Sequence, residues 1–178
     1  RSMTAFLVPA DLPGVAITKI EDKMGQRASN TAEITFTDVR VPKEYMIGRE
    51  GRGFAVALKT LDFARAGVAA LATGLARRAL ELATDYVQQR IQFGKPISEQ
   101  QGLQFMLADM AMAVEASRLL SLQAAWMSDE GLPNSKESAI AKCFAADAAM
   151  RVTTDAVQLF GGYGYMRDQP VEKLMRDA

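Results

Sequence analysis

A long helical pattern begins at Gly53 and continues to the neighbourhood of Arg90. Large apolar residues recur in it at helical spacing, namely Phe54, Leu58, Leu61, Val68, Leu71, Leu75, Leu82 and Tyr86. A helix of roughly 35 residues extends for about 50 Å. Small residues beside this stripe permit close packing of another helix: Ala69, Ala70, Ala72, Ala76, Ala79 and Ala83. Gly67 and Gly74 weaken the helix locally, which suggests that something approaches that face.

This pattern is interrupted by Gly94 and Pro96, which end one helix and block its continuation. A second helix is predicted from about Glu99 to Asp129, with Ser98 as its cap and Gln101 as the capping-box partner. Its core stripe consists of Leu103, Leu107, Met110, Val114 and Leu120. The bend between the two helices presents Arg90, Gln92, Phe93 and Lys95. On spacing alone, an ordinary polar turn is the simpler account of these four residues.

A third helix is predicted from Asn134, its cap, with Glu137 in its first turn, to Gly161-Gly162. A fourth begins near Pro170, a favoured residue in a first helical turn. Long helices joined by short turns predict an antiparallel bundle. Apolar residues cover more of its surface than one core face needs, so we expect part of that surface to be buried against another subunit. The methionines among them fit core gap-filling as well: Met106, Met112, Met127 and Met150.

The chain before this bundle has the character of β-structure. Two short strands are predicted within residues 2–20, separated by the turn-forming cluster from Ala10 to Gly14. A third strand is predicted at residues 33–41, with Ile34 and Phe36 on one buried face. These strands are too few to form a stable sheet alone. The fold class is therefore α+β and mainly α, with a partial antiparallel β-region followed by an antiparallel four-helix bundle.

Composition excludes several classes of function. Lys and Arg number 21, as do Asp and Glu, and this zero net charge argues against broad binding to nucleic acid. No apolar run approaches the roughly 18 residues of a membrane span, and the N-terminus lacks a signal-peptide layout. The absence of histidine removes Ser-His and Cys-His nucleophile pairs and histidine metal sites. Cys143 is the only cysteine, so no internal disulfide forms, and we expect a buried thiol.

Three further segments are candidates for a site. The glycine-rich stretch Gly48–Gly53 precedes a helix but lacks the phosphate-loop pattern, so a flexible connection is favoured. Asp62 and Arg65 share a helix face, as a surface ion pair or as ligand-facing groups. Gly161, Gly162 and Gly164 fit a helix C-cap and turn, and they also let backbone come close to a bound group.

The chain resembles the acyl-CoA dehydrogenase family of flavoproteins. The resemblance rests on fragments in the family's order: MGQRASNT, ITFTDVRVP, GRGF, RIQFGKPI, LADM, AAW, AVQLFGGYGY and PVEKLMRDA. It identifies residues 1–48 as the end of the family's middle β-domain and residues 49–178 as most of its C-terminal helical domain, truncated before the end. The fold it implies is the four-helix bundle of that family.

The resemblance implies FAD-dependent α,β-dehydrogenation of an acyl-CoA thioester, with electrons passed to an electron-transfer flavoprotein. It implies a homotetramer arranged as a dimer of dimers, located in the cytoplasm of a bacterium or in the mitochondrial matrix of a eukaryote. Two alternatives remain open: an acyl-CoA oxidase-like flavoenzyme and a non-catalytic helical oligomerisation module.

Residue by residue, the resemblance assigns Arg90 to the FAD pyrophosphate and Phe93 to the ADP half. It assigns FAD contacts also to Gln100, Gln101, Gln158, Gly161 and Gly162, with those from the third helix reaching the FAD of a neighbouring subunit. Asp62 and Arg65 match positions that line the thioester channel. No catalytic residue is assigned, because Ala64 stands at one position used for the family's glutamate base and we expect the other beyond Ala178. The 178 residues alone are therefore expected to be inactive.

Overall fold

The computed structural model of the protein describes residues 3–178 as two compact units, one ending at Leu61 and the other beginning at Asp62. The first contains strands β1 to β4 and the start of the long helix α1 (Gly53–Gln89). The second contains the rest of α1 and the other helices, and every candidate site residue lies in it. No helix among residues 3–178 is both long and apolar enough to cross a membrane.

Two small antiparallel ribbons make up the β-structure of the first unit. Strand β2 (Val15–Ile20) pairs with β3 (Ala32–Phe36), while β1 (Ala5–Phe6) pairs with β4 (Met46–Ile47). The predicted turn before β2 ends at Gly14, which has a φ of +89°. A Cβ added at this position would lie only 2.1 Å from the Thr37 carbonyl oxygen. The antiparallel pairing predicted for this region is confirmed, and the third strand ends earlier than predicted, at Phe36.

The buried face predicted for the third strand is wrong for this chain. Ile34 and Phe36 are 52% and 59% exposed, and Ile17, which faces Ile34 across the ribbon, is 63% exposed. Their alternation with polar residues does produce a strand. A ribbon of two strands, however, has no second layer of its own to cover either face.

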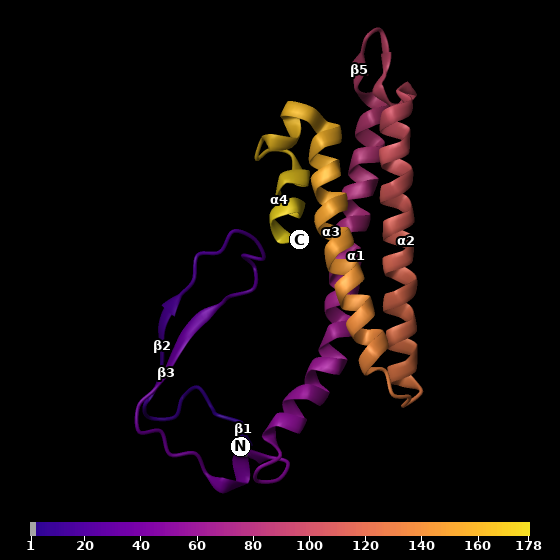
Figure 1. Ribbon diagram of the computed structural model, residues 1–178. Coiled ribbons are helices and arrows are strands. Elements are labelled where there is room, and N and C mark those ends of the chain that lie inside the picture. The colour runs from indigo at the N-terminus through magenta and orange to yellow at the C-terminus, as the bar shows by residue number, and fades with distance from the viewer. Residues whose placement is uncertain (1–2) are drawn as a thin grey trace. The chain divides into compact units, whose positions relative to one another are not determined.

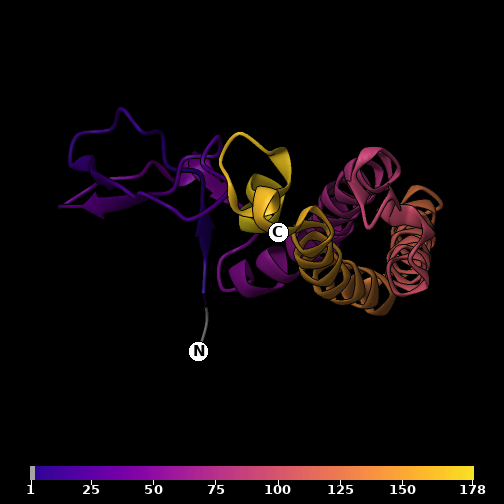
Figure 2. The same cartoon turned by 90° about the horizontal axis from the view of Figure 1, so that it is seen from above.

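The helices of the second unit follow the predicted order. Helix α1 is followed by α2 (Gln101–Asp129), α3 (Ser135–Phe160) and the short α4 (Pro170–Asp177). Within this unit α2 runs antiparallel to both α1 and α3, which run in the same direction, and α4 lies beside α3, as Figures 1 and 2 show. Glycines with positive φ follow α2 and α3, namely Gly131 and Gly161, in agreement with the predicted helix ends.

Of the two predicted helix caps, Ser98 is wrong and Asn134 is confirmed in position only. Ser98 lies inside a short 3-10 turn (Ile97–Glu99), so α2 starts later than expected, after Gln100, with no side-chain cap. Asn134 is the N-cap residue of α3, as predicted, but its side chain makes no cap hydrogen bond, and its amide nitrogen donates to the Ala124 carbonyl at 3.1 Å. The side chain thereby joins the α2–α3 connection to the body of α2.

The core of the bundle is built mainly from alanine. On α1 the fully covered residues are Ala69, Ala76, Ala79 and Ala83, and they meet a matching set on α3 that includes Ala141, Ala145 and Ala149. The larger apolar residues that recur along α1 lie one position away and are partly exposed, for example Val68 at 44% and Leu71 at 52%. Alanine faces the other helices because small side chains let backbones approach closely.

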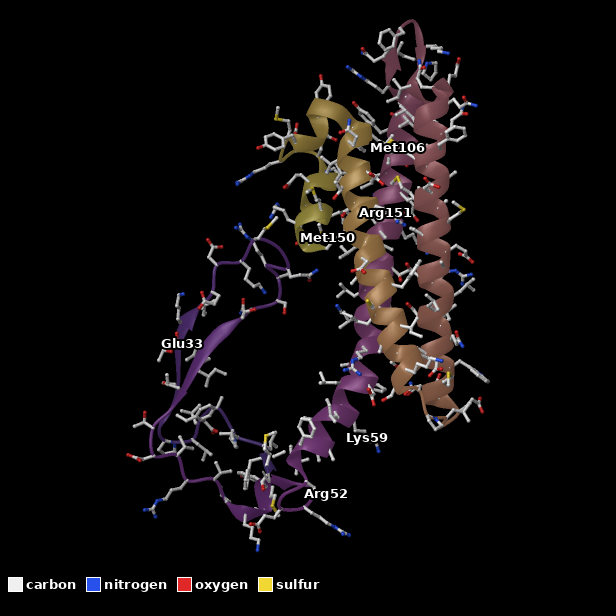
Figure 3. The ribbon with its side chains drawn as sticks, viewed as in Figure 1. Glu33, Arg52, Lys59, Met106, Met150 and Arg151 are labelled. Carbon is white, nitrogen blue, oxygen red and sulfur yellow. The ribbon has the colours of Figure 1, made fainter. Side chains whose placement is uncertain are left out.

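Within residues 3–178, no residue makes the approach predicted at Gly67 and Gly74, and the buried thiol predicted for Cys143 is wrong. A Cβ added at Gly67 or Gly74 would meet nothing within 4 Å, so no described residue approaches that face at these glycines. Cys143 is exposed, since it lies on the outward side of α3 between the core positions Ala141 and Ala145. Exposed apolar residues also lie on the outer sides of α2 and α3, among them Met112, Leu119, Trp126, Phe144 and Met150. Figure 3 marks Met106, Met150 and Arg151 on these two helices.

Candidate functional site

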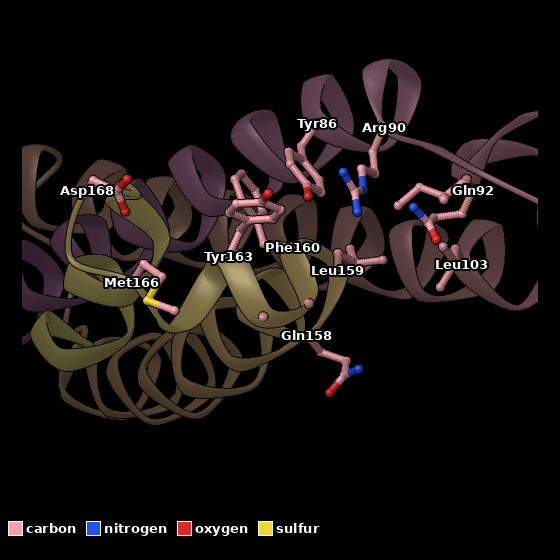
Figure 4. Close-up of a pocket in the computed structure, with 13 residues that line it drawn as sticks. Tyr86, Arg90, Gln92, Leu103, Gln158, Leu159, Phe160, Tyr163, Met166 and Asp168 are labelled. Atoms are coloured by element: carbon pink, nitrogen blue, oxygen red, sulfur yellow. The ribbon is translucent and has the colours of Figure 1, made fainter.

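A cleft of about 590 Å³ lies where the C-terminal ends of α1 and α3 meet the start of α2. Figure 4 shows the residues that line it. Contributions come from α1 and the hairpin after it, from the end of α3, and from the 3-10 turn that follows (Gly161–Tyr165). Its lining residues are Tyr86, Arg90, Gln92, Ile97, Leu103, Gln158, Leu159, Phe160, Gly161, Gly162, Tyr163, Met166 and Asp168.

Two stacked aromatic rings join α1 to α3 at this cleft. The rings of Tyr86 and Phe160 are 4.0 Å apart between centroids and only 13° from parallel. Phe160 is buried and Tyr86 partly buried, so this contact fixes the distance between the two helix ends. The sequence did not predict the pair as part of a site, because apolar residues at helix ends are usually core residues.

Arg90 follows directly after α1, and its backbone is held from both sides. Its N–H donates to the Tyr86 carbonyl at 2.9 Å, and its own carbonyl accepts from the Ile97 N–H at 2.9 Å. The guanidinium carbon lies over the ring of Tyr163, 5.5 Å from the centroid. None of the ion pairs found among residues 3–178 involves Arg90. Its guanidinium is therefore not paired with a carboxylate, although Asp168 also lines the cleft.

The glycine turn forms the opposite side of the cleft. Gly161 has a φ of +60°, and neither Gly161 nor Gly162 would direct a Cβ at any atom within 4 Å, so their backbone is accessible. Gly164 is different, since a Cβ there would lie 2.4 Å from the Val157 carbonyl oxygen. The turn thus packs against α3 through Gly164 and exposes backbone to the cleft at Gly161 and Gly162.

Four of the seven predicted cofactor residues share this cleft: Arg90, Gln158, Gly161 and Gly162. Figure 4 shows the Gln158 side chain pointing away from Arg90 and Tyr163. The other three do not line the cleft. Gln100 and Gln101 stand at the start of α2, and Phe93 lies at the tip of the hairpin formed by β5 (Ile91–Gln92) and β6 (Lys95–Pro96). Phe93 has a φ of +55° and its side chain is 92% exposed.

The predicted substrate residues lie elsewhere on α1. Arg65 Nη1 donates to Asp62 Oδ1 at 2.7 Å, while Asp62 Oδ2 accepts a hydrogen bond from the Ser135 hydroxyl at the start of α3. Both carboxylate oxygens of Asp62 thus accept hydrogen bonds within the protein. An apolar hollow of about 370 Å³ lies beside the pair, lined in part by Phe63, Ala64 and Asn134.

The cleft has the chemistry that a diphosphate-bearing dinucleotide requires. A guanidinium without a carboxylate partner offers donors to phosphate oxygens, and exposed glycine backbone lets a ligand come close. Tyr86, Phe160 and Tyr163 provide aromatic surface. The spacing of the sequence gave no signal for Tyr86 or Phe160, whereas Tyr163 lies within the GGYGY segment, where only the glycines were singled out. No group of three or more potential metal ligands occurs within the described part of the chain.

Comparison with known proteins shows which proteins this chain is similar to. The family model described as "Acyl-CoA dehydrogenase, C-terminal domain" matches residues 51–178. The short-chain specific acyl-CoA dehydrogenase of Megasphaera elsdenii is 52% identical over 178 residues, which are 100% of this chain and 46% of that protein. The chain thus spans about half the length of the curated relatives that it matches.

Solved structures of related proteins are similar to this chain as well. The structure of butyryl-CoA dehydrogenase from Megasphaera elsdenii superposes with a TM-score of 0.97 at 52% identity, covering 99% of this chain and 46% of that one. A chain in a structure of the electron transferring flavoprotein of Acidaminococcus fermentans, studied for flavin-based electron bifurcation, gives a TM-score of 0.95 at 54% identity, over 97% of this chain and 46% of the other.

Proposed function

Because the chain belongs to the acyl-CoA dehydrogenase family, we propose that the protein catalyses the FAD-dependent α,β-dehydrogenation of an acyl-CoA thioester to the 2-enoyl-CoA. The observation that carries this proposal is the cleft at the ends of α1 and α3. It brings Arg90, Gln158, Gly161 and Gly162 together at one place, and the family resemblance assigns all four to the same cofactor.

Arg90 has the clearest role in this proposal. Its guanidinium would bind the FAD pyrophosphate through charge-assisted hydrogen bonds, while the open backbone at Gly161 and Gly162 would admit the adenosine part. When bound, FAD supplies the acceptor for the hydride that leaves the substrate β-carbon. The chain's part in that step is to hold the cofactor and the thioester in fixed relative positions.

Asp62 and Arg65 are proposed to line the thioester channel. Since Asp62 is bonded to both Arg65 and Ser135, its carboxylate fixes the Arg65 side chain and does not serve as the base that removes the α-proton. Ala64, on the same turn of α1, carries no titratable group. A glutamate outside the 178 residues is therefore proposed as the base.

The substrate and the partners are proposed from the relatives. Short-chain acyl-CoA thioesters are favoured, since the compared relatives are named short-chain and butyryl-CoA dehydrogenases. An electron-transfer flavoprotein is proposed as electron acceptor, in line with the Acidaminococcus fermentans structure. The exposed apolar residues of α2 and α3 support assembly into a homotetramer, in which the cleft binds the FAD of a neighbouring subunit.

The test is anaerobic reduction of the purified full-length protein by acyl-CoA thioesters of different length. We expect a flavin absorbance spectrum and faster bleaching by butyryl-CoA than by octanoyl-CoA or palmitoyl-CoA. A protein that retains no FAD and binds none on titration would instead act as a helical oligomerisation module. Rapid peroxide formation in air, with substrate present, would identify an oxidase and overturn the dehydrogenase assignment.

A further inference from the structure

Tyr163 is the one aromatic residue of the cleft that contacts Arg90 through the face of its ring. The guanidinium carbon lies 5.5 Å from the ring centroid, within the range of a cation–π interaction. The guanidinium N–H groups make no hydrogen bond or ion pair with any described residue, so these donors are free for other partners.

A carboxylate in the same place would act differently. It would also hold the arginine, but by occupying its donors and cancelling its charge, as Asp62 does for Arg65. Glu99, in the turn after the hairpin, is instead paired with Lys95 at 3.7 Å, and Asp168, which lines the same cleft, makes no ion pair with Arg90. Arg90 is therefore restrained by a neighbour that leaves both its charge and its hydrogen-bonding edge available.

The backbone on both sides of this contact is anchored. Arg90 is bonded to Tyr86 and Ile97, as described above. Tyr163 lies in the turn that Gly164 packs against α3, and its carbonyl accepts from the Met166 N–H at 3.1 Å. The backbones of both residues are thus held in place, and the contact with the ring restrains the Arg90 side chain between them.

We propose that Tyr163 is a positioning residue for the cofactor site. Its ring holds the Arg90 guanidinium over the ring face, so that the N–H donors of Arg90 are presented to a diphosphate. The inference rests on the proposed FAD site and adds to it a residue whose contact is with Arg90. A restrained arginine loses less conformational freedom on binding than a free one, and this difference raises affinity.

The test measures FAD and ADP dissociation constants by titration of the flavin-free full-length protein. We expect Tyr163→Leu to weaken both about tenfold, the effect of losing a partly exposed cation–π contact. Tyr163→Phe keeps the ring and should bind as the wild type does, and Tyr163→Trp should bind at least as tightly. Tyr165→Leu, two residues along the same turn at a position 85% exposed and outside the cleft, is the matched control and should have no effect.

A double-mutant cycle separates positioning from direct contact. In an Arg90→Ala background, Tyr163→Leu should cause no further loss of affinity, because the ring no longer has an arginine to hold. An undiminished tenfold loss in that background would overturn the inference and make Tyr163 a direct ligand contact. A loss in Tyr163→Phe equal to that in Tyr163→Leu would also overturn it, by assigning the effect to the hydroxyl.

The midpoints of thermal unfolding of the flavin-free variants provide the remaining control. We expect them to agree, since Tyr163 is half exposed. A lower midpoint for Tyr163→Leu, together with an undiminished loss of FAD affinity in the Arg90→Ala background, would overturn the inference by assigning Tyr163 a structural role only. Failure of the wild-type protein to bind FAD would overturn both this inference and the proposed function, whereas FAD binding without coupling between the two residues would overturn this inference alone.

Discussion

Arg65 lies in the first half of helix α1 and Arg90 directly after its end, and the surroundings of these two arginines are opposite in kind. Arg65 donates to Asp62 at 2.7 Å, and Asp62 is held in turn by Ser135. Arg90 has no acidic partner and lies against the ring of Tyr163. One cation is paired with a carboxylate within the protein, and the other is restrained but unpaired.

The difference indicates which arginine can attract an anion. Asp62 and Arg65 together are neutral, so Arg65 can contribute further hydrogen bonds but little net attraction. Arg90 adds a positive charge to a cleft whose glycine backbone is open. A phosphate-bearing group is therefore expected at Arg90, and a neutral thioester is better suited to the neighbourhood of Arg65.

The largest expected effect is that of removing the unpaired cation. Arg90→Ala should weaken FAD binding by about 2 kcal/mol, or roughly 30-fold, because a charge-assisted phosphate contact is lost. The measurement is FAD titration of flavin-free protein. Arg78→Ala, on the outer side of the same helix, is the control and should bind FAD normally. Unchanged affinity in Arg90→Ala would rule out the assignment of this arginine to the cofactor.

The second prediction asks whether the glycine turn belongs to the same site as Arg90. Gly161→Val should lower FAD affinity by roughly tenfold relative to Gly131→Val. The backbone strain is similar in the two variants, since φ is +60° at Gly161 and +66° at Gly131 and each Cβ has open space. Only Gly161 lines the cleft. Equal flavin loss at both positions would mean that helix capping alone explains the glycine.

The arrangement of the helices that places the two arginines could be predicted from the sequence only in part. The helix bounds follow from the helical spacing of apolar residues and from the glycines at the helix ends. The start of α1 at Gly53 and the end of α3 before Gly161 agree with the prediction. The buried stripe of α1 could not be predicted from hydrophobicity, because leucine and alanine stripes lie one residue apart. The close approach of the helices selects Ala76 and Ala79 over Leu71 and Leu75.

Prediction from the sequence has the same limit at the cleft. Arg90, Gln158 and the two glycines were assigned by resemblance, and local spacing alone would have left them as a polar turn and a helix cap. Tyr86 and Phe160 were not predicted to stack, because their contact depends on how the ends of α1 and α3 meet. Helical periodicity describes one helix at a time and carries no information on which residues of two distant segments come together.

The third prediction concerns a variant in which Arg65 loses its charged partner and becomes more like Arg90. Asp62→Asn removes the charge that neutralises Arg65 and loosens its anchor. We expect the KM for the acyl-CoA substrate to rise by a few-fold with FAD affinity unchanged, and stability to fall by less than about 1 kcal/mol, because the pair is partly exposed. Steady-state kinetics and FAD titration are the measurements. A fall in FAD affinity as large as that of Arg90→Ala would show that both arginines serve one site.

The smallest effect is expected from an arginine–carboxylate pair remote from α1. In α4 the Arg176 side chain donates to both oxygens of Glu172, at 2.7 Å and 2.9 Å. This hydrogen bonding lowers the pKa of Glu172 from its ordinary value of 4.5. Because the folded protein favours the ionised form, the pair stabilises the fold above that value. The stabilisation is lost as the pH falls through the lowered pKa.

Glu172→Gln therefore serves as a reference for a pair that only stabilises. We expect a slightly lower midpoint of thermal unfolding than that of the wild type at neutral pH, and the difference should shrink toward zero in strong acid, where Glu172 is protonated in both states. FAD affinity and the KM should be unchanged, since neither residue lines the cleft. Asp62→Asn should share the small loss of stability and differ only in its raised KM. If Glu172→Gln raised the KM equally, the effect at Asp62 would reflect general loosening of the bundle, and the assignment of Arg65 to the substrate would lose its support.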